Sequence, residues 1–120
     1  GWVDLTVPEA ESLRDFYARV VGWKPQPVDM GGYADFNMTD AEGTARAGVC
    51  HRRGTNAELP PVWMVYFLIE DLARSLDAVR AAGGRVLVGP KGFGPAAKYA
   101  VIEDPAGAIC ALFENRAAPR

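Results

Sequence analysis

The chain begins with a short run in which apolar and polar residues alternate, and a helical pattern follows it. Residues 2–7 read WVDLTV, which predicts a strand with one apolar face. Pro8 ends this strand because it has no N–H to donate. The apolar residues after it recur at helical spacing, and Gly22 can close the helix. The positions on the predicted apolar helix face are Leu13, Phe16, Tyr17, Val20 and Val21.

Three further strand patterns complete the first half of the chain. Residues 23–30 carry two prolines and predict an edge strand or a loop, residues 33–40 alternate, and residues 44–53 predict a weaker strand. The segment GTNAELPP, residues 54–61, collects turn formers and two prolines. We therefore expect a first module over residues 1–53, followed by a linker over residues 54–61.

The second half repeats this plan at an offset of about 62 residues. Residues 62–69 predict a strand, and Asp71 can cap a helix that ends at two glycines. Strand patterns follow, with KGFGPAA at residues 91–97 predicted to be a loop. The expected second module covers residues 62–115, and residues 116–120 are expected to form a frayed tail. The positions at helical spacing are Leu72, Leu76, Val79 and Arg80.

This duplication predicts an α+β fold made of two βαβββ modules in one chain. A four-stranded sheet covered by one helix keeps its other face open. Two such open faces placed side by side can curve into a cleft, and small-molecule sites form in concave places where elements meet. The repeating unit is too long, and it occurs too few times, for a solenoid. The sequence therefore predicts one globular domain with a ligand cleft.

Composition narrows the possible partners of this domain. The formal net charge is −2 and the basic residues are scattered, so we expect no nucleic-acid partner. No apolar run approaches the roughly 20 residues that cross a bilayer, and no signal-peptide pattern is visible, so we expect a cytoplasmic protein without membrane contact. Cys50 and Cys110 show no CxxC spacing and are expected to be buried thiols in a reducing compartment.

Three segments of the chain resemble a known superfamily when they are taken together in this order. These are WVDLTVPEAESLRDFYARVVGW at residues 2–23, FLIEDLARSLDAVRAAGGRVL at residues 67–87, and YAVIEDPAGAICALFE at residues 99–114. The chain is similar to the vicinal-oxygen-chelate superfamily of glyoxalase I, bleomycin-resistance proteins and extradiol dioxygenases, and to its bacterial glyoxalase-like subset. The resemblance implies a U-shaped, cup-like mixed sheet with the helices on the outside.

The resemblance also implies where a metal site would lie. Metal-using members carry His or Glu at four places, which correspond here to Trp2, Met64, Ala111 and either Ala47 or Gly48. None of these residues offers the nitrogen or oxygen electron pair that a divalent metal needs, since an indole N–H is only a donor. A thioether alone would suit only soft ions. We therefore expect no metal and no other cofactor.

Alternation then predicts the residues that line the cup. The first strand of each module and the last strand of the second module present an apolar, aromatic surface with few polar groups. Phe93 is added because the KGFG loop could place it over the cup. His51, the single histidine, is expected to be exposed and non-catalytic. The expected ligand-binding residues are Trp2, Asp4, Thr6, Met64, Tyr66, Leu68, Phe93, Ile109, Ala111 and Phe113.

These features favour a metal-independent protein that binds a small hydrophobic or aromatic molecule, with Asp4 available to orient a cationic one. The alternative is a metal-dependent lyase, isomerase or dioxygenase of the same superfamily that uses non-standard ligands. A third interpretation is a structural or regulatory half of a larger protein. The sequence leaves open whether the protein is an enzyme. A homodimer is the expected assembly, through exposed sheet edges.

Overall fold

The computed structural model describes residues 2–116, apart from the side chains of Thr55 and Phe93. Residues 117–120 of the expected tail lie outside the described part. The chain divides into two compact units, Trp2–Trp63 and the residues from Met64 onward, which we call module one and module two. Within the described residues, no helix has the length and apolar character that crossing a membrane requires.

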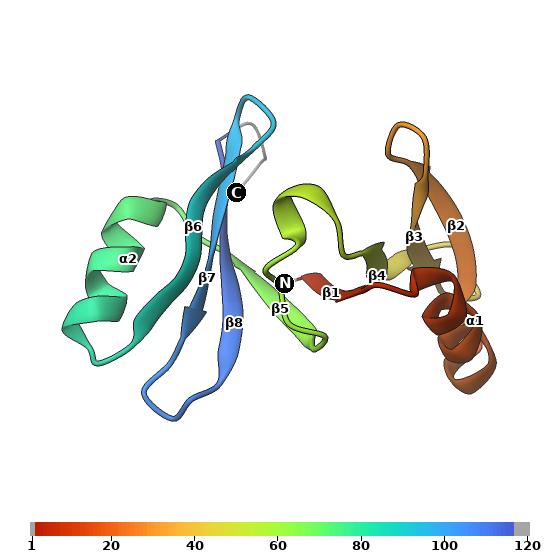
Figure 1. Ribbon diagram of the computed structural model, residues 1–120, viewed down its shortest axis with the longest axis horizontal. Coiled ribbons are helices and arrows are strands. Elements are labelled where there is room, and N and C mark those ends of the chain that lie inside the picture. Colours follow the sequence, from red (N-terminus) through yellow and green to blue (C-terminus); the bar gives the residue numbers. More distant parts are fainter. Residues whose placement is uncertain (1, 117–120) are drawn as a thin grey trace. The chain divides into compact units, whose positions relative to one another are not determined.

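Module one has the predicted order strand, helix and three strands (Figure 1). Its sheet runs in the order β2-β3-β4-β1, with β1 parallel to β4 and the other neighbours antiparallel. The proline-rich strand β2 lies at the edge, where its missing N–H groups break no ladder. Its elements are β1 Trp2–Val7, α1 Ala10–Val21, β2 Lys24–Asp29, β3 Ala34–Thr39 and β4 Ala45–His51.

Module two repeats the arrangement with the sheet order β5-β8-β7-β6, and β5 is parallel to β8. A short 3-10 helix at Gly54–Asn56 lies in the connection before it. The α+β fold of two βαβββ modules is therefore confirmed. The elements of module two are β5 Trp63–Leu68, α2 Leu72–Ala81, β6 Arg85–Phe93, β7 Ala97–Glu103 and β8 Ile109–Asn115.

The core of module one lies between α1 and one face of its sheet. Leu13, Tyr17 and Ala18 of the helix pack on buried strand residues. The predicted apolar face of α1 was partly wrong, since Phe16 and Val20 are 54% and 63% exposed. The buried stripe is rotated toward Ala10, because small residues let the helix backbone approach the sheet. The buried residues of this core are Leu5, Val7, Ala10, Phe36, Met38 and Val49.

The core of module two places the predicted helix residues under α2. Leu72 and Leu76 are buried and Val79 packs beside them, whereas Arg80 is exposed and pairs with Asp77. Two carboxylates hold the N-terminus of the helix. Asp71 accepts a hydrogen bond from the Arg74 N–H at 3.1 Å, as a capping residue does, and buried Glu114 of β8 accepts one from the Leu72 N–H at 2.8 Å.

The predicted loop at residues 91–97 is shorter than expected. Lys91, Gly92 and Phe93 belong to β6 and pair with Tyr99, Lys98 and Ala97 of β7. The alternation of apolar and polar residues is interrupted in this strand because it contains two glycines and a proline. Its pairing with β7 also has register shifts between Val86 and Lys91. The connection between β6 and β7 therefore covers residues 94–96 rather than the predicted 91–97.

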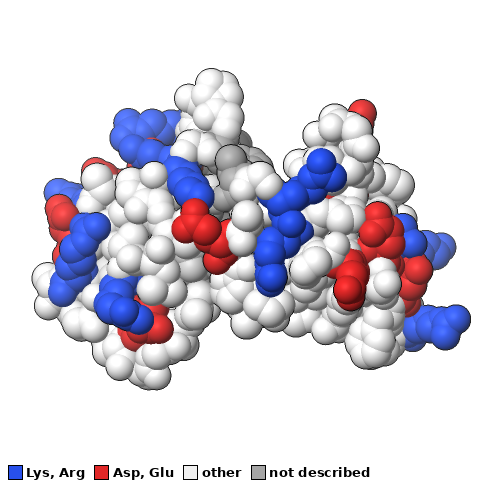
Figure 2. Space-filling view, in the orientation of Figure 1, with Lys and Arg blue, Asp and Glu red and all other residues white. Residues whose placement is uncertain are grey.

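Charged side chains of both signs are interspersed on the face drawn in Figure 2. Several form local pairs, such as Arg85 with Glu103 at 2.9 Å and Arg46 with Asp40 at 2.7 Å. Exposed pairs of this kind contribute little to stability.

Candidate functional site

Each sheet has one face packed under its helix and one face turned away from it, which we call the open face. In module one, the pairing of Leu5 with Val49 places both in the core under α1. The intervening pairs, Asp4 with Gly48 and Thr6 with Cys50, therefore lie on the open face. The predicted orientation of Trp2, Asp4 and Thr6 away from the helix follows from this register.

Asp4 is held on the open face of module one by two features of its neighbours. The Trp2 Nε1–H donates a hydrogen bond to Asp4 Oδ1. Gly48 lies opposite on β4, and a Cβ atom there would overlap Oδ1, so the glycine provides the space for the carboxyl group. Burial raises the pKa of Asp4 from 3.8 to about 6, and the nearby Asp35 carboxylate adds to this rise while the Trp2 hydrogen bond opposes it.

A second carboxylate, Asp35 of β3, lies close to Asp4 and was not predicted as a site residue. Asp35 is only 8% exposed, and its Oδ1 accepts a hydrogen bond from the His51 N–H at 2.8 Å. Burial, together with both carboxylates, raises the pKa of the Cys50 thiol far above its ordinary value, which keeps the thiol protonated. The alternation in residues 33–40 was the signal that could have placed Asp35 on this face.

The choice between Ala47 and Gly48 as the fourth family position is settled by the register. Ala47 pairs with Met38, which is part of the core under α1, so Ala47 faces the helix. Gly48 pairs with Asp4 on the open face. Of the two alternatives, Gly48 is therefore the residue on the open face, and it has no side chain at this place.

In module two, the predicted faces are also found. Leu112 packs in the core under α2 and pairs with Phe67, so the neighbouring pairs Tyr66–Ala111 and Leu68–Phe113 lie on the open face. Their accessibility differs, since Leu68 is 52% exposed whereas Met64 and Ala111 are 2% and 0% exposed. The accessible apolar residues of this face on β5 and β8 are Tyr66, Leu68, Ile109 and Phe113, and Lys91 and Asn115 add polar groups to the same face.

Thr6 is on the open face of module one but only 5% exposed, so a ligand would reach Asp4 and Trp2 before it. The side chain of Phe93 lies outside what the structure describes. Its backbone is part of β6.

The four positions that the resemblance links to a metal carry no ligating side chains. Trp2, Gly48, Met64 and Ala111 supply no carboxylate, imidazole or thiolate. Over the described residues, no group of three or more His, Cys, Asp and Glu side chains is arranged to hold a metal ion.

His51 lies between two carboxylates, and the expectation that it is exposed is wrong. Its side chain is 13% exposed, with Nε2 at 3.0 Å from Glu11 Oε2 and Nδ1 at 3.2 Å from Asp35 Oδ1. The ring of Tyr33 packs edge-on against it. Burial disfavours the charged imidazole, but the hydrogen bonds to Glu11 and Asp35 outweigh burial and raise the pKa of His51. The imidazole thereby joins α1 to β3 and β4.

Replacing His51 with glutamine is expected to lower the free energy of unfolding by about 1 kcal/mol below pH 6. A raised pKa gives stability that is fully present below 6.5 and is lost as the pH rises through the folded-state value. The difference between the wild type and H51Q should therefore shrink toward pH 8 in urea unfolding series. Since His51 is the single histidine, a constant difference across this range would contradict the role of its charge.

Comparisons with known proteins identify relatives of this fold. The family model for the Glyoxalase/Bleomycin resistance protein/Dioxygenase superfamily matches residues 1–111. The chain is 30% identical over 117 residues to the putative glyoxylase CFP32 of Mycobacterium tuberculosis, covering 95% of this chain and 44% of CFP32. It is 28% identical over 127 residues to the anthracycline biosynthesis protein DnrV of Streptomyces peucetius, covering 96% of this chain and 46% of DnrV. The chain thus spans less than half the length of these curated relatives.

A solved structure supports the same fold. Glyoxalase I from Zea mays superimposes with a TM-score of 0.63 at 16% sequence identity, and the match covers 100% of this chain and 44% of that protein. At this identity the likeness concerns the fold alone.

Proposed function

Because this chain belongs to the Glyoxalase/Bleomycin resistance protein/Dioxygenase superfamily, we propose that it binds a small hydrophobic or aromatic molecule without a metal. The observation that carries this proposal is the accessible apolar strip on the open face of module two, formed by Tyr66, Leu68, Ile109 and Phe113. Flat or hydrophobic molecules pack well on such side chains. Binding instead of metal catalysis is favoured because the four family positions lack ligating groups.

Asp4 and Trp2 lie on the open face of module one and offer polar chemistry there. An ionised Asp4 attracts a cationic group, and the partly exposed Trp2 ring is available for stacking or a cation–π contact. We therefore choose an aromatic amine as the probe, since its ring suits the strip of module two and its charge suits Asp4 of module one as a separate surface. The name of DnrV connects that relative to anthracycline biosynthesis, which agrees with a small-molecule role in this family branch.

The alternative function is that of a metal-dependent lyase, isomerase or dioxygenase with unusual ligands. Turnover of a hemithioacetal after addition of Ni, Zn, Mn or Fe would favour it. A rise in melting temperature with one of these metals alone would also count against the binding proposal. The proposed site does not require a second subunit, and the homodimer stays a prediction.

The proposal can be tested with 9-aminoacridine, a flat aromatic cation, by following its fluorescence and the melting temperature of the protein. We expect binding that raises the melting temperature and is insensitive to EDTA. L68D should weaken binding at least ten-fold, because it places a carboxylate in the apolar strip. F67D is the matched control, since Phe67 is 50% exposed but lies on the helix side of the sheet. F67D should change affinity less than two-fold, and equal effects of the two variants would refute the site.

A further inference from the structure

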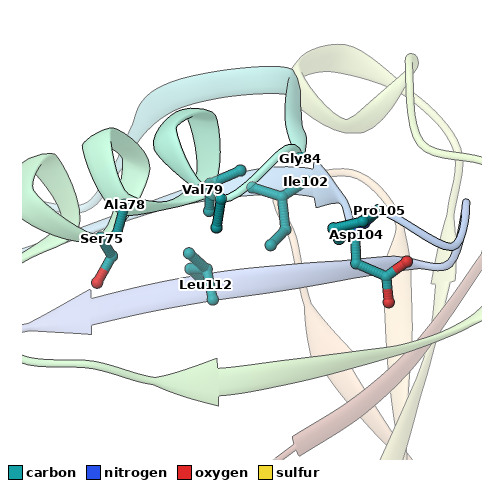
Figure 3. A pocket seen from close by; sticks show the side chains of 9 residues that line it. Ser75, Ala78, Val79, Gly84, Ile102, Asp104, Pro105 and Leu112 are labelled. Atoms are coloured by element: carbon teal, nitrogen blue, oxygen red, sulfur yellow. The ribbon is translucent and has the colours of Figure 1, made fainter.

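Module two contains a second hollow, on the helix side of its sheet rather than on its open face (Figure 3). This groove has a volume of about 380 Å³ and lies between α2 and the β7–β8 end of the sheet. Such a volume falls in the range of roughly 300–1,000 Å³ that ligand pockets occupy. Figure 3 shows Val79 over the strand residues, with Ser75 and Asp104 toward opposite ends. Four of the residues that line it belong to α2 or its C-cap: Ser75, Ala78, Val79 and Ala82.

Module one shows what fills the corresponding place. At the repeat offset of 62 residues, Val79 of α2 corresponds to Tyr17 of α1. The Tyr17 ring packs edge-on against Trp63, with centroids 4.9 Å apart, and the Trp63 Nε1–H donates a hydrogen bond to the Tyr17 hydroxyl at 3.0 Å. The rings of Trp23 and Trp63 also pack edge-on, with centroids 6.2 Å apart. The segment that follows β4 thus places an indole ring against the helix and the core of module one.

Module two lacks the side chains that would occupy this volume. Valine stands in place of Tyr17, and Ala78 stands in place of Phe16. The helices also differ in coverage, since α1 packs on all four strands of its sheet whereas α2 packs on β6, β7 and β8. The floor of the groove is formed by Ile102 and Leu112, which belong to the core under α2. An apolar surface of this kind is stabilised when an apolar group covers it.

We propose that the groove of module two is a docking site for a tryptophan side chain carried on a peptide segment, as Trp63 docks on module one. The indole ring fits a volume in which valine stands in place of the core-packed Tyr17. The Ser75 hydroxyl lies one helical turn before Val79 and can accept the indole N–H, as the Tyr17 hydroxyl does in module one. The partner is therefore a tryptophan-bearing peptide rather than a free small molecule.

The test uses the intact chain and the acetylated, amidated peptide ELPPVW, whose sequence is that of residues 58–63. We expect the amide NMR signals of Ser75, Val79 and Leu112 to shift on titration, and the same peptide with alanine in place of tryptophan to cause no shift. A78F should weaken binding at least ten-fold by filling the groove. A73F is the matched control, because Ala73 is an exposed residue elsewhere on α2, and it should change affinity less than two-fold.

Three results would overturn the proposal. The first is a wild-type titration that leaves the groove signals unshifted. The second is an affinity that A78F does not change while circular dichroism shows the variant to be folded. The third is N-acetyltryptophanamide binding as tightly as the peptide, which would make the groove a small-molecule pocket. None of these results bears on the 9-aminoacridine experiment, because the groove and the open face lie on opposite sides of the sheet.

Discussion

Replacing Trp63 with alanine is expected to lower the free energy of unfolding of module one by about 2–4 kcal/mol, which is somewhat less than the loss of a fully buried tryptophan. The indole packs on the module-one core and contacts both Tyr17 and Trp23. Its removal also leaves the Tyr17 hydroxyl without its donor. Urea unfolding followed by circular dichroism measures the loss.

Two companion variants separate packing from hydrogen bonding at this position. W63F keeps an aromatic ring but no N–H, so we expect a loss of about 1 kcal/mol. V62A is the matched control, because the side chain of Val62, the residue before Trp63, is 39% exposed. Such surface substitutions usually change the free energy of unfolding by no more than about 0.5 kcal/mol. If W63A were no less stable than V62A, Trp63 would not be part of the module-one core.

Replacing Asp4 with asparagine is expected to remove a fall of about 3 kcal/mol in the free energy of unfolding as the pH rises from acid to neutral. The native carboxyl has a pKa of about 6 instead of 3.8, and each pH unit between these values corresponds to about 1.4 kcal/mol. A raised carboxyl pKa gives stability that is fully present below pH 3.8 and is lost as the pH rises through about 6. Asparagine does not ionise, so D4N should lack this fall.

The measurement is a series of urea unfolding curves from pH 4 to pH 7 for both proteins. D77N serves as the control, because it makes the same substitution at an exposed residue of α2. Identical slopes for the wild type and D4N would show that Asp4 ionises as an ordinary carboxylate.

The repeated order of elements could be predicted from the sequence because it is encoded locally. Alternation in residues 2–7, the stop at Pro8 and the cap at Asp71 act through a few neighbouring residues, and each is found as predicted. The same holds for the faces of β5 and β8, where a period of two fixes the direction of every side chain once one core residue is known.

The predictions that failed depend on contacts between distant segments. His51 reads as a polar residue at a strand end, but Glu11 and Asp35, which hold its ring, are 40 and 16 residues away. The buried stripe of α1 is set by how closely Ala10 approaches the sheet, which hydrophobic spacing alone does not reveal. The space beside Asp4 exists because β1 pairs with β4 in one register, and only that register selects Gly48 over Ala47.

The position of Trp63 has a practical consequence for dividing this protein into halves. Its backbone opens β5, the first strand of module two, while its side chain belongs to the core of module one. A recombinant fragment that stops at Arg53 would therefore leave the Tyr17 ring exposed, whereas one that runs through Trp63 would retain it. The two halves share this residue, so isolating both intact requires that it be present in each.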